Sequence, residues 1–220
     1  MRDYIIESSK KSPFFIKGIE VKEADPLPDG VNIESILSAI EKNFPSHYFD
    51  KLEAIIISHL DEFDERGTNA VYRDNKFYIS NRLKDTNDLL DDIVHEFAHH
   101  METLFPEMLY SDQALIREFV RKRHELNFEL RSEGYWTDDY DFENLKFDKD
   151  FDLFLYKRVG TNMLKMITTG LFIRPYAAVS IREYFATGFE AFYLGKQNAL
   201  EKISPILYDK ISELHTYNNK

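Results

Sequence analysis

The sequence predicts an α+β fold that is mostly helical and includes a small mixed β-sheet. Two observations lead to this class. Short runs rich in β-branched and aromatic residues, typical of strands, occur between residues 52 and 79. After about residue 86, apolar residues recur at the spacing of helices. Composition and charge shift nowhere enough to divide the 220 residues, so we expect a single domain.

The N-terminal part begins with loop-forming sequence. Residues 1–30 end in a run of Asp, Pro and Gly, so we expect an irregular N-terminal arm ahead of a main domain of residues 31–220. Asn32 is placed to cap a helix that Pro45 ends. That helix carries four apolar residues on one face: Ile33, Ile36, Leu37 and Ile40.

A strand and a hairpin are predicted next. Residues 52–57 are rich in isoleucine and short enough for a buried strand. An acidic connector of residues 61–66 follows. Residues 70–72 and 77–79 then flank a polar tip, a pattern that favours a β-hairpin.

The rest of the chain is predicted to be helical apart from one loop. A broad apolar stripe runs from Thr86 or Asn87 to about Leu104, and Pro106 closes that helix. An acidic, aromatic loop is expected at residues 134–152. Further helices are expected at residues 112–132, 153–169, 180–194 and 204–215.

Composition argues against several functions. The chain has no cysteine, which excludes disulfide scaffolds, cysteine-bound zinc, iron–sulfur clusters and thiol catalysis. Its net charge of −11 argues against nucleic acid as a partner. The sequence lacks both the roughly 7–15 consecutive apolar residues of a secretory signal and the roughly 18 of a membrane span. We therefore expect no membrane partner and a cytoplasmic location as synthesised, with export by another route and the oligomeric state left open.

The predicted helix of residues 86–104 contains an HExxH motif, His95-Glu96-Phe97-Ala98-His99. Histidines four residues apart project from the same helix face, so both imidazoles can bind one Zn²⁺. Glu96 is displaced around the helix, where its carboxylate can take a proton from an attacking water. The motif therefore predicts a catalytic zinc site.

A catalytic zinc needs a third protein ligand. A third histidine six residues beyond the motif is absent, because Phe105 stands there. Glu118 follows His99 by nineteen residues, a spacing seen in thermolysin-like zinc enzymes. Its neighbours Arg117 and Arg121, however, favour a solvated, ion-paired helix face. Glu118 is therefore the weaker of two candidates.

Glu183 is the stronger candidate for the third ligand. The sequence from Ser180 to Glu183 is also a capping box, in which Glu183 would only close the first turn of a helix. One carboxylate oxygen could serve each role. Both interpretations stay open from the residues alone.

The motif helix and the segment that starts at Tyr176 resemble the anthrax lethal factor-like zinc peptidases, a family that includes the Pro-Pro endopeptidases. After HExxH, those enzymes carry a tyrosine and, seven residues later, a glutamate that opens an aromatic helix. Here Tyr176 and Glu183 stand seven apart, and Glu183-Tyr184-Phe185-Ala186 opens the matching segment. The resemblance covers residues 86–104 and 176–215.

The resemblance implies a zincin-like catalytic domain with one Zn²⁺ per chain. His95, His99 and Glu183 would be the zinc ligands. Glu96 would be the general base, and Tyr176 would donate its hydroxyl to the oxyanion. These roles predict a zinc-dependent endopeptidase that hydrolyses a peptide or protein substrate.

Two other functions are compatible with the same residues. The chain could be a catalytically inactive zincin-like binding protein, or a zinc amidase acting on a small substrate. The predicted hairpin favours the peptidase, because a strand edge can pair with an extended peptide. The acidic charge balance, with Asp138, Asp139 and Asp141 in one loop, favours basic peptides.

Overall fold

The computed structural model describes residues 14–217 and shows a five-stranded mixed sheet. The strand order is β1-β2-β3-β5-β4; the two outer pairs are antiparallel and the two inner pairs are parallel. This confirms an α+β protein with a small mixed sheet. The strands are β1 (Phe14–Ile16), β2 (Ile19–Glu23), β3 (Ala54–Ile57), β4 (Ala70–Arg73) and β5 (Lys76–Ile79).

Residues 14–23 form a β-hairpin, so the prediction of an irregular arm at residues 1–30 is wrong there. The turn residues Lys17 and Gly18 both have positive φ, 48° and 84°, as a tight two-residue hairpin turn requires. Strand β1 has only three residues, too few for the alternation of apolar and polar side chains to be evident. Residues 1–13 of the predicted arm lie outside the described residues.

Ten α-helices are described between residues 14 and 217, and none of them is long and apolar enough to cross a membrane. Short 3₁₀ segments lie at Ser46–Phe49 and Pro175–Ala178, and a π-helical segment at Phe154–Gly160. The α-helices are α1 (Ile33–Asn43), α2 (Asp61–Arg66), α3 (Thr86–Leu104), α4 (Pro106–Tyr110), α5 (Ala114–Ser132), α6 (Lys149–Leu153), α7 (Thr161–Thr168), α8 (Ile181–Tyr193), α9 (Gln197–Ile203) and α10 (Pro205–Thr216).

Most of the predicted elements are confirmed, and several differ. The acidic connector of residues 61–66 is the short helix α2. The helix expected at residues 153–169 is divided into α6, which begins inside the loop expected at residues 134–152, the π-helical segment and α7, with Gly160 at the last junction. Helices α4 and α9 lie where no elements were predicted. The hairpin of β4 and β5 and the helices α1, α3, α5, α8 and α10 match the sequence prediction.

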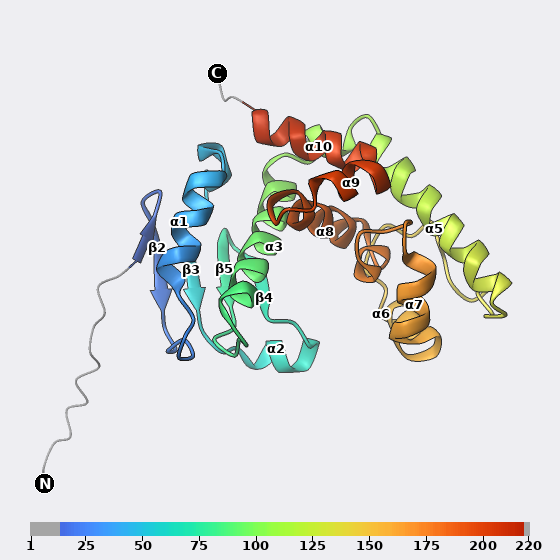
Figure 1. The fold of residues 1–220 in the computed structure, drawn as a ribbon, viewed down its shortest axis with the longest axis horizontal. Helices are drawn as coiled ribbons and strands as arrows, with labels where there is room; N and C mark the ends of the chain where they lie inside the picture. The colour runs from blue at the N-terminus through green and yellow to red at the C-terminus, as the bar shows by residue number, and fades with distance from the viewer. Residues whose placement is uncertain (1–13, 218–220) are drawn as a thin grey trace, which may run out of the picture.

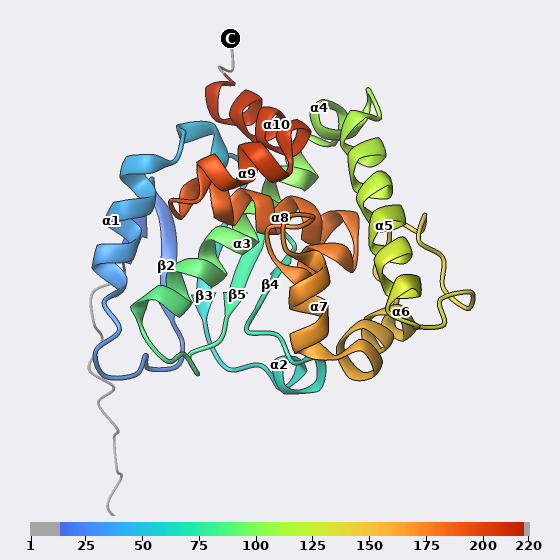
Figure 2. The ribbon, with the colours of Figure 1, turned by 45° about the vertical axis from the view of Figure 1, so that its right-hand side comes forward.

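Helices α1 and α3 lie over one face of the sheet, and α8 packs along α3 on its far side (Figures 1 and 2). The parallel pair of β2 and β3 is joined through α1, the crossover that parallel strands need. Helices α5, α6 and α7 lie at the end of the molecule away from β1 and β2 (Figure 1). Helix α3 therefore lies between the sheet and the C-terminal helices.

A glycine allows α8 and α10 to approach closely. A Cβ atom added to Gly188 would lie 2.3 Å from Cδ2 and 2.8 Å from Cγ of Leu207. Leu207 is almost fully buried, so its side chain has little room to move.

We expect Gly188→Ala to lower the free energy of unfolding by about 1–3 kcal/mol, because overpacking outweighs the helix propensity gained from alanine. Urea unfolding curves measure this effect. The double variant Gly188→Ala/Leu207→Ala should lose less stability than the two single losses added together. Strict additivity, or a more stable Gly188→Ala variant, would contradict the proposed close contact.

Candidate metal centre

Helix α3 holds the two histidines of the motif away from the sheet. Its N-cap is Asp85, whose side chain accepts hydrogen bonds from the backbone of the first turn. Phe97 is fully buried, and its ring centroid lies 4.9 Å from that of Phe77 on β5. Since residues 95 and 99 lie on the opposite side of the helix from residue 97, packing of Phe97 on the sheet directs both histidines towards α8.

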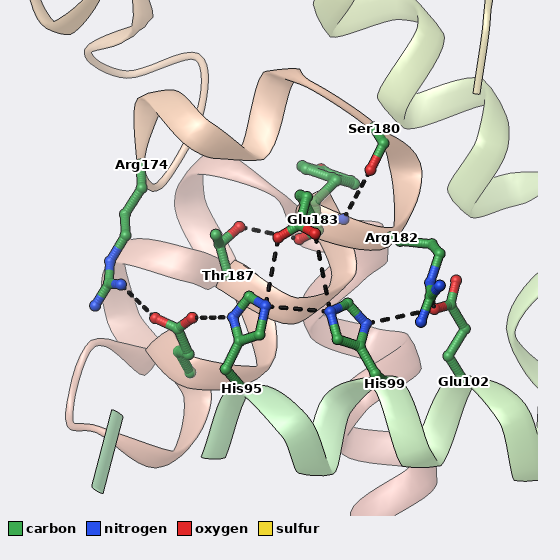
Figure 3. Close-up of polar contacts among 10 residues, drawn as sticks. His95, His99, Glu102, Arg174, Ser180, Arg182, Glu183 and Thr187 are labelled. Atoms are coloured by element: carbon green, nitrogen blue, oxygen red, sulfur yellow. Dashed lines mark hydrogen bonds and ion pairs between the residues drawn. The ribbon is translucent and has the colours of Figure 1, made fainter. Parts of the chain in front are cut away.

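The third residue comes from the first turn of α8. Ser180 caps this helix, and its Oγ accepts a hydrogen bond from the backbone N–H of Glu183 at 3.2 Å. The carboxylate of Glu183 faces the two histidines (Figure 3). The capping interaction therefore uses the backbone N–H of Glu183, which leaves its carboxylate facing the two histidines.

The three side chains converge on one point. The Nε2 atoms of His95 and His99 lie 3.1 Å apart. The Glu183 carboxylate oxygens lie 3.4 Å from Nε2 of His95 and 3.8 Å from Nε2 of His99. All three ligand atoms are within 4.8 Å of one another, so the group could hold a metal ion.

This geometry fits a small tetrahedral cation. With bonds of about 2.0–2.1 Å, tetrahedral ligand atoms lie roughly 3.3 Å apart, close to the separations found here. Oε2 of Glu183 is buried and has no hydrogen-bond partner among the described residues. A buried carboxylate whose two oxygens face two imidazole nitrogens is an arrangement that a cation would stabilise.

The charges in the site act on one another strongly. Burial alone would lower the pKa of His95, but the carboxylates of Glu183 and Glu190 raise it to about 10. Burial would raise the pKa of Glu183, but His95 and His99 hold it below its ordinary value. An ion bound here would have to displace a proton from His95.

Glu96 lies beside the three-residue group in a nearly dry position. It is 2% exposed, and its Oε2 has no hydrogen-bond partner among the described residues. Burial raises its pKa, while the charges of His99 and His95 and a hydrogen bond from the backbone of Tyr72 act in the opposite direction. A buried carboxyl group with a raised pKa is suited to accept and return a proton.

The contact with Tyr72 places Glu96 at the edge of the sheet. Arg73 and Lys76 flank the two-residue turn between β4 and β5 and form a hydrogen-bonded pair. Because hydrogen-bonded and non-hydrogen-bonded pairs alternate along an antiparallel hairpin, the next pair, Tyr72 and Phe77, is not hydrogen-bonded. The backbone N–H and C=O groups of Tyr72 therefore point away from β5, as do those of Ala70. Among the described strands, none pairs with this outer edge of β4.

Tyr176 lies near the group, but its hydroxyl makes no hydrogen bond among those described. The residue is 37% exposed, and partial burial together with the charge of Glu183 raises its pKa. Its ring centroid lies 6.3 Å from that of Tyr156, in the π-helical segment. The charge of Glu183 also acts on Tyr156, whose pKa burial raises to about 12. Both tyrosines therefore lie close enough to Glu183 for its charge to act on them.

Glu118 is not part of this group, and the prediction of a solvated position for it is wrong. It is 5% exposed on α5. Its carboxylate accepts hydrogen bonds from the Tyr184 hydroxyl at 2.8 Å and from the backbone N–H groups of Ile206 and Leu207 at 3.1 and 3.0 Å. Glu118 thus caps the first turn of α10, which has no side-chain cap of its own.

The other described histidines are not part of the group. His100 is fully buried and bonds with the Tyr72 hydroxyl and the carbonyl of Asp50. His47 bonds with the carbonyl of Leu214, which ties the 3₁₀ segment at Ser46–Phe49 to α10. These side chains support the fold.

The sequence analysis missed three charged residues around the two histidines: Glu102, Arg174 and Arg182. Arg174 pairs with Glu190, whose carboxylate faces His95. Arg182 pairs with Glu102, whose carboxylate faces His99. Tyr156 was missed as well, since nothing near it in the chain marks it. Glu102 follows His99 by three residues, a spacing on one helix face that could have indicated it.

The fold and the site together define an α+β protein with a two-histidine, one-carboxylate group and a buried glutamate beside it. Comparisons with models of protein families, with curated proteins and with solved structures found no match to this chain. The functional argument therefore depends on the geometry of the site and on the sequence motif.

Proposed function

We propose that this protein is a zinc-dependent endopeptidase of the lethal factor-like, zincin type. The observation that carries the proposal is the convergence of His95, His99 and Glu183. Two histidines from one helix and a glutamate from another are a typical ligand set of a catalytic zinc, which keeps a fourth position open. The buried carboxylate of Glu96 beside them supports hydrolysis rather than a purely structural ion.

In this proposal the residues of the chain divide the chemistry between them. A bound Zn²⁺ would supply Lewis-acid chemistry, polarising the scissile carbonyl and making a water molecule more acidic. Glu96 accepts the proton of the attacking water and then delivers it to the leaving amine. Tyr176 donates its hydroxyl to the oxyanion.

The edge of β4 supports an extended peptide as the substrate. Ala70 and Tyr72 turn backbone groups outward, and Tyr72 also contacts the proposed base. A peptide that added itself to this edge as a further strand would bring its backbone next to Glu96. A small amide would have no use for such an edge, which favours the endopeptidase over the amidase.

Two measurements test the proposal. Mass spectrometry of the purified protein should find about one zinc per chain. A chelator should then abolish cleavage of a mixed peptide library, and added Zn²⁺ should restore it. Zinc without cleavage of any peptide would favour the inactive binding protein, and a protein that takes up no zinc would refute the proposal.

A further inference from the structure

The Nδ1 atom of His95 faces a buried carboxylate. Glu190 on α8 is 3% exposed, and its Oε1 lies 2.7 Å from Nδ1 of His95. Its other oxygen lies 2.5 Å from Nη1 of Arg174. Arg174 also lies 3.7 Å from Asp91, one turn before His95 on α3. One arginine thus links α3, α8 and the segment that leads to Tyr176.

This contact determines which nitrogen of His95 can bind an ion. A carboxylate only accepts hydrogen bonds, so Nδ1 of His95 must carry the proton that it donates to Glu190. The lone pair for a metal is then on Nε2, the atom that faces His99 and Glu183. The ring is held in the orientation that the site needs before any ion arrives.

The second histidine has a similar but looser support. Glu102 receives hydrogen bonds from Tyr110 at 2.5 Å and from Arg182 at 2.9 Å. Its Oε2 lies 3.7 Å from Nδ1 of His99, too far for a hydrogen bond. Nδ1 of His99 has no hydrogen-bond partner among the described residues. His99 is therefore held less firmly than His95.

Resting on the proposed function, we propose that Glu190 and Arg174 are positioning residues for the metal. Glu190 fixes the tautomer and ring orientation of His95, and Arg174 holds Glu190 in place. The Glu102–Arg182 pair contributes less, because its carboxylate stands off from His99. The affinity for zinc thus depends unequally on the two arginine–carboxylate pairs.

The test measures zinc affinity rather than activity. Metal-free protein competes with a chromophoric chelator for Zn²⁺, and Glu190→Gln is compared with the matched control Glu102→Gln. We expect Glu190→Gln to weaken zinc binding by about 10–100-fold, the usual cost of losing a supporting residue, and Glu102→Gln to weaken it by less than about threefold. Equal losses, or a larger loss for Glu102→Gln, would overturn the inference.

Arg174 provides a second variant that does not disturb the core, because its side chain is 39% exposed. Arg174→Lys keeps the charge but loses the planar fork, so its affinity should lie between those of wild type and Arg174→Met. Unfolding curves of the metal-free variants show whether each is folded. If wild type binds zinc but no loss follows either substitution at Arg174, this inference fails alone; if wild type binds no zinc, the proposed function fails with it.

Discussion

Replacing Glu96 with glutamine is expected to lower kcat/KM for a cleaved peptide by at least about 100-fold and to leave the zinc content unchanged. The substitution keeps the size of the side chain but removes the group that accepts a proton. Glu96 is not among the three residues that could hold the ion, so the metal should stay. Glu96 is held by the backbone of Tyr72 on β4. We therefore expect no neighbouring carboxylate to take over as the proton acceptor.

The measurement pairs steady-state cleavage with zinc analysis of the same preparation. Glu107→Gln is a suitable control, because Glu107 is an exposed carboxylate on α4. That variant should cleave like wild type. If Glu96→Gln kept near-normal cleavage, Glu96 would not be the general base. Loss of zinc from Glu96→Gln would instead assign it a role in binding the ion.

The helices that carry the site could be predicted because their signals are local. The apolar stripe of α3 and the Ser180 cap of α8 each depend on residues within one or two helical turns, so both helices can be predicted from the sequence. His95 and His99 are similarly fixed by their spacing along one helix. The sequence alone left two roles for Glu183. In the structure its backbone N–H donates to the Ser180 cap, and its carboxylate faces the two histidines.

The rest of the site depends on contacts between distant residues. Glu190 is 95 residues from His95 in the chain, and nothing in the sequence says that their side chains meet. Glu118 was misjudged for the same reason, since its partners on α10 are 88 and 89 residues away. Charged neighbours predict a solvated face only when no other helix covers it. The hairpin at residues 14–23 escaped prediction because a three-residue strand is stabilised by its partners rather than by its own pattern.

The two glutamates that the sequence offered as the third ligand should separate cleanly in experiment. Glu183→Ala should lose more zinc affinity than the roughly 10–100-fold expected for a supporting residue, because one of three ligands is gone. The metal-free protein should lose less free energy of unfolding than Glu118→Ala does, because Glu190 still pairs with His95 after Glu183 is removed. Zinc analysis and urea unfolding of the same samples measure both effects.

Glu118→Ala should behave in the opposite way. It should keep its zinc and lose about 2–5 kcal/mol of unfolding free energy, because two backbone N–H groups of α10 and the buried Tyr184 hydroxyl lose their acceptor. Glu118→Gln, which retains one acceptor oxygen, should recover part of that loss. A Glu118→Ala protein that was stable but free of zinc would reverse the assignment, because a carboxylate that only caps a helix cannot alter metal binding without altering the fold.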